Sequence, residues 1–368
     1  GAIWPDQKVI IGCHHDAWCF GAGDPLSGTI VVFEAARSFA EAAKRGFKPA
    51  RTLVFATWGA EEFGIIGSTE YCEQFGSDLT GNTVAYINLD AASMGPNFSS
   101  SASPSLKAVI DQAAGAVPQA RSASGATVRA TWLGDRDEPN FGNLGGGSDH
   151  VGFYCHLAIP SCGLGADGAA GTAYHSLFDN LHWYRQVVGE DYEPALMVTR
   201  VVNQLAARLA NAPIVPLDPS RYTSDLRTHL DELSKLAATK NMTLDLSTVE
   251  SRTTEVGDLA KSVAARLTSI NASALSQDTL TAINRELLSL EQCWVVDAGL
   301  PDRAWYRNIF AASDPDSGYA AWMLPGLRWA IERQDATAAE KALDQIAQAL
   351  EKLKSHIQAI QTHIEGVP

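Results

Sequence analysis

Short apolar runs alternate with longer amphipathic segments over the first part of the chain. Residues 9–11, 52–56 and 84–87 are almost wholly apolar, which is typical of strands buried on both faces of a parallel sheet. Apolar positions at helical spacing predict helices over residues 28–43, about 105–116 and about 189–210. Together these elements indicate an α/β fold, with a mostly parallel central sheet flanked by helices.

The pattern changes near residue 215. Prolines at positions 213, 216 and 219 interrupt helix continuity, and the chain beyond about residue 220 lacks strand-like alternation. Amphipathic spacing there predicts helices over residues 226–238, 256–270, 277–295 and 338–364. We therefore predict an α/β domain over residues 1–215 and an all-helical domain over residues 216–368.

Histidine and acidic residues follow each of the three predicted strands. His14 and Asp16 come after the first run, Glu61 and Glu62 after the second, and Asp90 after the third. Ligands of open α/β sheets bind beyond the carboxyl ends of the strands. We therefore expect these side chains to meet at one edge of the sheet.

Two further candidates stand in short motifs, Asp24 in Gly-Asp-Pro and His175 in Tyr-His-Ser. Zinc accepts imidazole nitrogen and carboxylate oxygen, and a catalytic zinc keeps one position open for water. Two zinc ions need one carboxylate between them and about two further ligands each. The sequence offers that set as His14, Asp24, Glu62, Asp90 and His175.

Two residues beside these ligands have predicted roles in the chemistry. A water held between two zinc ions loses its proton near neutral pH and becomes a nucleophile. Glu61 is the predicted general base that carries this proton to the leaving amine. Asp16 is predicted to accept the free ring N–H of His14, which fixes the tautomer of the imidazole.

Each motif taken alone also has an ordinary structural interpretation. A single histidine is usually a structural residue, and Glu61-Glu62 could begin a solvated helix, where carboxylates favour the helix dipole. Asp24-Pro25 is a common turn pair, and Asp90 could cap a loop. The placement of three motifs after three separate strands argues for one site.

The chain resembles the dizinc peptidases that include glutamate carboxypeptidase and the non-enzymatic transferrin receptor. The matching stretches are residues 12–25, 51–68, 84–90, 144–153, 174–180 and 300–307. The resemblance implies Asp24 as the bridging ligand, His14 with Asp90 on one zinc, and Glu62 with His175 on the other. It further implies that Glu61 is the general base and that Tyr174 stabilises the oxyanion.

The same resemblance extends to the surroundings of the site. It implies that the helical domain forms a homodimer, that part of this domain brings Tyr319 to the rim of the site, and that the protein is secreted, periplasmic or extracellular. Members of the family carry further strands and a protease-associated domain upstream of the position of Gly1, and we expect neither these nor a targeting segment within residues 1–368.

Specificity for acidic substrates in this family depends on basic residues that are absent here. Two family arginines would fall at Cys162 to Gly165, and a third within residues 97–103, which contain no basic residue. A family lysine would align near Gly318. Ser148 and Gly147 are expected to line the pocket, where glycine lets the backbone approach a substrate closely. We therefore predict an aminopeptidase or a broad di-/tripeptidase that acts on small peptides.

Two alternatives remain open. The first is an amidohydrolase that cleaves an aminoacyl or other non-peptide amide at the same metal site. The second is a non-catalytic interaction protein like the transferrin receptor, although all five ligands are present here.

Composition and charge argue against nucleic acid as a partner and against a membrane span. The chain has 368 residues, and its net charge of −14 disfavours nucleic acid as a partner. No run approaches the roughly 20 apolar residues of a membrane span. Six cysteines show no CxxC pair.

Overall fold

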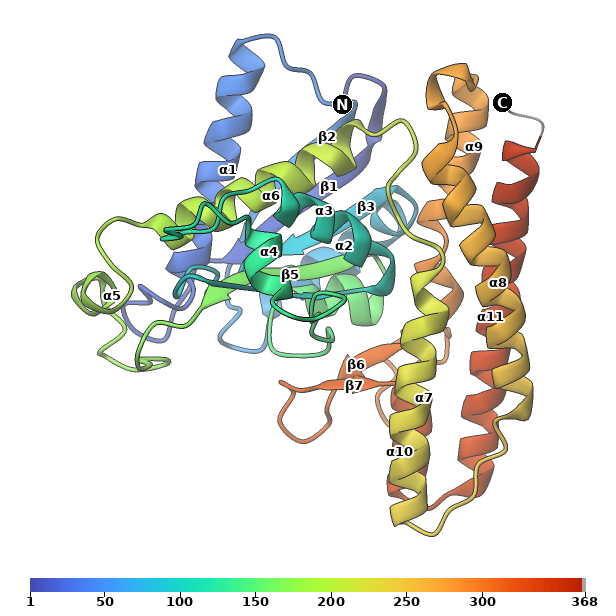
Figure 1. Cartoon of the computed structure of the whole chain (residues 1–368). Coiled ribbons are helices and arrows are strands. Elements are labelled where there is room, and N and C mark those ends of the chain that lie inside the picture. The colour runs from blue at the N-terminus through green and yellow to red at the C-terminus, as the bar shows by residue number, and fades with distance from the viewer. Residues whose placement is uncertain (366–368) are drawn as a thin grey trace.

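The computed structural model describes residues 1–365 as a five-stranded sheet followed by a group of helices (Figure 1). Four strands are parallel in the order β2-β1-β3-β5, and β4 pairs antiparallel with β5 at one edge. The strands are β1 (Trp4–His14), β2 (Arg51–Trp58), β3 (Thr83–Asn88), β4 (Asn97–Ala102) and β5 (Ser161–Asp167). The α/β fold predicted from the sequence is confirmed, and the three predicted strands are neighbours, β2-β1-β3, in this five-stranded sheet.

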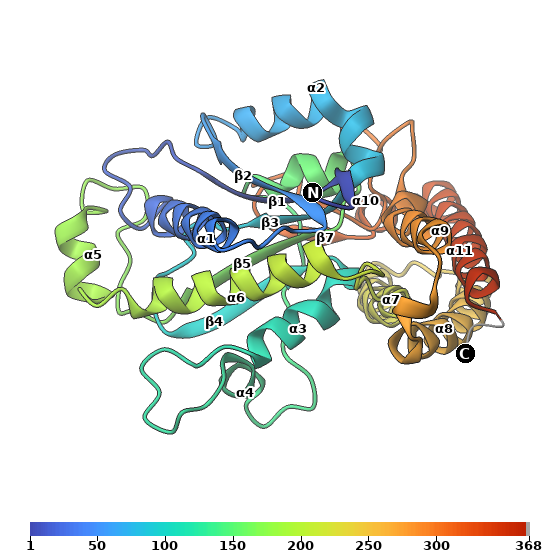
Figure 2. The ribbon, with the colours of Figure 1, turned by 90° about the horizontal axis from the view of Figure 1, so that it is seen from above.

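Both faces of the sheet are covered, so successive residues of a strand enter different cores. Val9 and Ile11 pack on one face, whereas Ile10 packs on the other with Tyr86. The first face carries α1 (Leu26–Lys44), α3 (Lys107–Gly115) and α6 (Glu193–Asn211). The second carries α2 (Ile66–Asn82) and a π-helix (Val151–His156), as Figure 2 shows from above. This double burial explains why residues 9–11 of β1 and 84–87 of β3 are apolar at every position.

The helices of this first part differ from the prediction mainly at their starts. The helix predicted over residues 105–116 begins with a 3₁₀ turn (Pro104–Leu106) before α3, and α6 begins at Glu193 because Pro194 favours the first helical turn. The structure adds three helices that the pattern did not predict. They are α2, α4 (Val128–Leu133) and α5 (Leu181–Val187).

The C-terminal part is a group of helices beside the sheet (Figure 1). Its helices are α7 (Arg221–Thr239), α8 (Ser247–Ser269), α9 (Gln277–Leu288), α10 (Pro325–Glu332) and α11 (Ala336–Ile364). The long α11 packs against α8, α9 and α10. The predicted domain boundary at residue 215 falls in the connection between α6 and α7. No helix within residues 1–365 has the length and apolar character needed to cross a membrane.

Two expectations for the C-terminal part are wrong. The helix predicted over residues 277–295 ends at Leu288, and a 3₁₀ turn (Glu291–Trp294) follows. The break turns Trp294 inward, where it packs against Tyr222 and Phe310. The region also contains a two-stranded hairpin, β6 (Ala311–Ser313) and β7 (Ala321–Met323), whose strands are too short to show an alternating pattern.

The hairpin brings the C-terminal part onto the sheet domain. Strand β6 packs against the π-helix, and the backbone N–H groups of Arg307 and Asn308 donate to the carbonyl of Cys155. Segments far apart in the chain therefore meet beside the carboxyl ends of the strands.

Close packing of α1 on the sheet predicts a strong effect of Gly28→Ala. A Cβ atom at Gly28 would lie 1.5 Å from the carbonyl oxygen of Leu89, which is backbone. We expect the free energy of unfolding to fall by about 3 kcal/mol, because overpacking forces backbone shifts. Chemical denaturation measures this change.

Gly81→Ala is the matched control, because Gly81 also lies in a helix and its Cβ would meet no atom within 4 Å. Alanine there is expected to raise stability by up to about 1 kcal/mol through helix propensity. Equal stabilities of the two variants would contradict the proposed packing.

Candidate metal centre

The five candidate ligands meet at the carboxyl ends of the parallel strands, and each comes from a different segment. His14 ends β1, and Asp24 lies in the loop between β1 and α1. The others follow strands: Glu62 stands in the turn after β2, Asp90 after β3 and His175 in the loop after β5. The topology thus brings together residues that lie up to 161 positions apart in the sequence.

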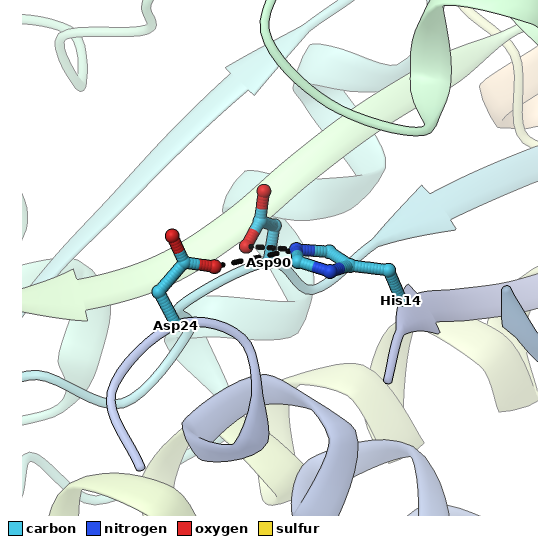
Figure 3. Close-up of side chains that lie close together, drawn as sticks. All are labelled: His14, Asp24 and Asp90. Atoms are coloured by element: carbon cyan, nitrogen blue, oxygen red, sulfur yellow. Dashed lines mark hydrogen bonds and ion pairs between the residues drawn. The ribbon is translucent and has the colours of Figure 1, made fainter. Parts of the chain in front are cut away.

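The ligand atoms form two groups that share Asp24. His14 Nε2 lies 3.1 Å from Asp90 Oδ1 and 3.3 Å from Asp24 Oδ1 (Figure 3). His175 Nε2 lies 3.1 Å from Asp24 Oδ2 and 3.1 Å from Glu62 Oε2. Within each group of three residues, the possible ligand atoms all lie within 4.8 Å of one another. Asp24 therefore presents one carboxylate oxygen to each group.

The site fits a pair of divalent cations. Asp24 Oδ1 and Glu62 Oε1 are buried and make no hydrogen bond within the described residues. Buried carboxylate oxygens without a hydrogen bond are costly, and bound cations would compensate their charge. Imidazole nitrogen combined with carboxylate oxygen is a donor set that suits zinc.

Crowding of charge shifts the titration of these groups in the metal-free chain. Burial lowers the pKa of His14, but the neighbouring carboxylates of Asp24 and Asp90 outweigh this effect and raise the pKa to about 12. Burial raises the pKa of Glu61 to about 8. Burial also raises the pKa values of Asp24 and Glu62. The metal-free site therefore holds protons that a cation must displace.

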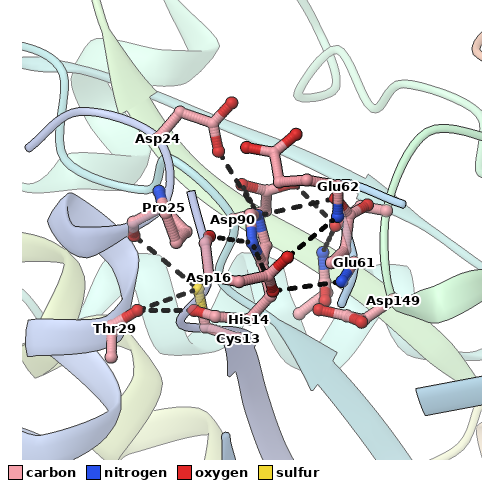
Figure 4. A network of polar contacts seen from close by, with 12 residues as sticks. Cys13, His14, Asp16, Asp24, Pro25, Thr29, Glu61, Glu62, Asp90 and Asp149 are labelled. Atoms are coloured by element: carbon pink, nitrogen blue, oxygen red, sulfur yellow. Dashed lines mark hydrogen bonds and ion pairs between the residues drawn. The ribbon is translucent and has the colours of Figure 1, made fainter. Parts of the chain in front are cut away.

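Asp16 contacts the expected partner through a different atom. The ring Nδ1 of His14 lies 3.0 Å from the backbone carbonyl oxygen of Asp16, whereas the Asp16 carboxylate is 3.7 Å away. That carboxylate instead accepts the backbone N–H groups of Glu61 and Glu62, at 3.0 and 3.2 Å (Figure 4). The structure thus places the predicted acceptor, Asp16, at the His14 ring, and the accepting atom is the backbone carbonyl oxygen. Asp16 fixes His14 with its backbone and the glutamate turn with its side chain.

Glu61 occupies a position suited to proton transfer. It is buried, and its Oε2 lies 3.9 Å from His14 Nε2. Its neighbour Glu62 points to His175 instead. The two adjacent glutamates thus face different parts of the centre.

A cavity of about 350 Å³ opens beside the centre. Its walls include Asp24, Glu61, Glu62, Asp90 and His175, together with Trp18, Ile65, Gly147, Tyr174, Tyr306 and Tyr319. The ring of Tyr174 stacks on that of His175, with centroids 3.6 Å apart, and its hydroxyl lies 3.4 Å from that of Tyr319. The predicted rim residues Tyr174, Tyr319 and Gly147 therefore lie together in this cavity.

Tyr319 reaches the cavity from the turn between β6 and β7. The carboxylate of Asp314 accepts the backbone N–H groups of Asp316, Ser317 and Ala320 and the Ser317 hydroxyl. The turn also packs closely on the sheet domain: a Cβ at Gly146 would lie 1.7 Å from the carbonyl oxygen of Gly318. Sequence reasoning missed Asp314, although it stands five residues before Tyr319.

A second cavity of about 250 Å³ lies against Asp90 from the β4–β5 side. It is lined by Asn88, Asp90, Ala91, Ser99, Ser100, Ser101 and residues 163–167. A Cβ at Gly163 would meet no atom within 4 Å, so the space above this residue is open. Neither Lys nor Arg lines this cavity or the first one.

Two further residues hold the ligands in place. Asp179 accepts the backbone N–H groups of Gly23 and Asp24, at 2.6 and 3.0 Å. Ser148, predicted to line the pocket, is buried instead and donates its hydroxyl to Asp90 Oδ2 at 2.8 Å. Asp179 lies in the 174–180 motif, which was the only signal for it in the sequence.

Comparison with known proteins bears out the resemblance. Residues 2–186 match Peptidase family M28, and residues 239–358 match the transferrin receptor-like dimerisation domain. The chain is 32% identical over 329 residues to "Probable glutamate carboxypeptidase LAMP1" of Arabidopsis thaliana, covering 89% of this chain and 47% of the relative. It is 31% identical over 362 residues to "Aminopeptidase NAALADL1" of Rattus norvegicus, covering 90% of this chain and 47% of the relative.

The chain thus spans about half the length of these curated relatives. Among solved structures it is similar to the aminopeptidase from Aneurinibacillus sp. strain AM-1, with 26% identity and a TM-score of 0.40 over 54% of this chain and 43% of that chain. The matched segment 2–186 carries all five strands of the sheet and all five candidate ligands. The chain belongs to peptidase family M28 and carries a transferrin receptor-like dimerisation domain in its helical part.

Proposed function

We propose that the chain is a zinc-dependent exopeptidase that hydrolyses small peptides with two zinc ions per chain. The observation that carries this proposal is the position of Asp24, which faces His14 with one oxygen and His175 with the other. A carboxylate shared in this way is what a pair of cations requires. His14 and Asp90 would hold one zinc, and Glu62 and His175 the other.

The chain's own residues supply proton transfer and charge stabilisation. Bound zinc is a Lewis acid that activates water and polarises a carbonyl. Glu61 takes the proton from the attacking water and passes it to the leaving amine, a role that suits a buried carboxylate beside the centre. The Tyr174 hydroxyl, on the cavity wall, donates to the oxyanion that develops on the substrate.

The cavities favour substrates with neutral residues. A desolvated substrate carboxylate needs a cationic partner, and neither cavity is lined by Lys or Arg. The relatives include proteins named as glutamate carboxypeptidases and as aminopeptidases. We propose an aminopeptidase or a broad di-/tripeptidase for this chain rather than a glutamate-specific carboxypeptidase.

An amidohydrolase that cleaves a non-peptide amide would use the same centre, and a panel of peptides and aminoacyl amides separates the two. A receptor-like, non-catalytic role is less well supported, because all five donors converge. The match of residues 239–358 to a dimerisation domain supports a homodimer formed through the helical part.

Glu61→Gln tests the proton-transfer role. The amide keeps the size of the side chain but cannot accept the proton, so we expect turnover to fall about a thousandfold while two zinc ions remain bound. Asp24→Ala is the companion variant, and it should lose zinc as well as activity. Elemental analysis and peptide hydrolysis measure both effects. Retained activity or lost zinc in Glu61→Gln would refute the assigned role.

Zinc binding should release protons. His14 stays protonated up to a pKa of about 12 in the metal-free chain, and its Nε2 must lose this proton to bind zinc. This proton is bound in the metal-free state and absent in the zinc-loaded state, so the apparent affinity for zinc rises with pH. The rise is about tenfold per pH unit for each proton released.

Calorimetric titrations at pH 6 and pH 8, each in two buffers of different ionisation enthalpy, measure the released protons. A zinc affinity that does not change between these pH values would contradict the site.

Gly163→Arg tests the specificity. The space above Gly163 is open toward the cavity beside Asp90, so a guanidinium there could pair with an acidic substrate. We expect kcat/KM for peptides with Glu on the acyl side of the scissile bond to rise at least tenfold relative to Leu, from one charge-assisted hydrogen bond of about 1.5–3 kcal/mol. Gly163→Gln controls for size. Equal ratios in the two variants would show that this cavity does not hold the substrate side chain.

A further inference from the structure

A continuous chain of buried hydrogen bonds runs from β2 to the candidate ligand Asp90. Trp58 Nε1 donates to the Tyr86 hydroxyl at 3.0 Å, and this hydroxyl donates to Asn88 Oδ1 at 2.9 Å. Asn88 Nδ2 donates to the Ser148 hydroxyl at 2.8 Å, which donates to Asp90 Oδ2 at 2.8 Å. The four residues that lead to Asp90 through these hydrogen bonds are each at most 8% exposed: Trp58, Tyr86, Asn88 and Ser148.

The direction of every hydrogen bond in this chain follows from its ends. The indole N–H of Trp58 can only donate, so the Tyr86 hydroxyl accepts it and passes its single proton to the Asn88 oxygen. The Asn88 amide nitrogen can also only donate, so the Ser148 hydroxyl accepts and passes its single proton to Asp90. Asp90 Oδ2 is therefore an acceptor, and Oδ1 is left to face His14.

The packing of the sheet leaves room for this hydrogen-bond chain. Strand β1 lies between β2 and β3, so the contact between Trp58 and Tyr86 passes over it. A Cβ at Gly12 would lie 2.7 Å from Trp58 Nε1 and 2.8 Å from the Tyr86 hydroxyl oxygen, so only glycine leaves room for the contact. The Tyr86 ring stacks on Phe153, with centroids 4.0 Å apart, which fixes the hydroxyl in place.

The hydrogen-bond chain from Trp58 to Asp90 reaches only one of the two ligand groups of the centre. It ends on Asp90, which belongs with His14, whereas Glu62 and His175 form the other group with Asp24. None of the hydrogen bonds described for Glu62 or His175 joins them to Trp58, Tyr86, Asn88 or Ser148.

We propose that Trp58, Tyr86, Asn88 and Ser148 are positioning residues that orient the Asp90 carboxylate and set the metal affinity of the His14–Asp90 position alone. This proposal rests on the proposed metal centre. Residues that hydrogen-bond to a metal ligand typically change metal affinity by 10–100-fold when they are removed. The zinc affinities of the two positions should therefore respond differently when one of these hydrogen bonds is removed.

The test is a zinc titration of metal-free protein against a chromophoric chelator, which resolves two successive affinities. Ser148→Ala removes the donor to Asp90, and we expect one affinity to fall about 10–100-fold while the other stays unchanged. Tyr86→Phe removes one distant hydroxyl but keeps the ring stacked on Phe153. It should weaken the same affinity severalfold.

Tyr71→Phe is the matched control. Tyr71 lies on the same face of the sheet, next to Trp58 and Phe153, and its hydroxyl has no hydrogen bond among those described for residues 1–365. Removing that hydroxyl should leave both affinities unchanged.

The zinc titrations distinguish a failure of the positioning role from a failure of the metal centre. Wild-type protein that binds fewer than two zinc ions would refute the metal centre itself. With two zinc ions bound, unchanged affinities in both Ser148→Ala and Tyr86→Phe, or equal weakening of both positions, would overturn the positioning role. If Ser148→Ala does not fold, Tyr86→Phe alone decides, because it removes a single oxygen and keeps the packing.

Discussion

The concentration of carboxylates around Asp24 is the constraint on which the rest of the site depends. Asp24 faces two histidines, and oxygens of Asp24 and Glu62 are buried without a hydrogen bond. Such a group is stable only when cations or protons compensate it. In the metal-free chain the neighbouring carboxylates raise the pKa of His14, so a proton on this ring supplies part of the compensation. Two metal ions would supply this compensation with the same ligands.

The surrounding structure holds these ligands mainly through backbone and buried side chains. Asp179 fixes the loop of Asp24, Asp16 fixes the turn of Glu61 and Glu62, and Ser148 fixes Asp90. Asp179, Asp16 and Ser148 each lie in a different segment of the sequence from the residues that they hold. The C-terminal part adds Tyr319 through a turn that packs on the glycines after Leu144. The cavity is therefore built from both parts of the chain.

The sequence predicted most of what depends on local pattern. The strands over residues 9–11, 52–56 and 84–87 were recognisable because both faces of the sheet are covered, and the candidate ligands His14, Glu62 and Asp90 because they follow strand ends. Strands β4 and β5 were not predicted, since Asn97–Ala102 is rich in serine and Ser161–Asp167 contains two glycines, a composition that is weak in strand propensity. The carboxylate contacts of Asp16 and the inward turn of Ser148 depend on tertiary partners, so no local pattern could show them.

The most direct measurement is the zinc content of purified protein, by elemental analysis, alongside hydrolysis of a panel of aminoacyl-anilides and dipeptides. We predict two zinc ions per chain and cleavage after neutral residues. One zinc ion or none, in protein that is folded and was prepared with zinc present, would contradict the shared role of Asp24 and the mechanism built on it.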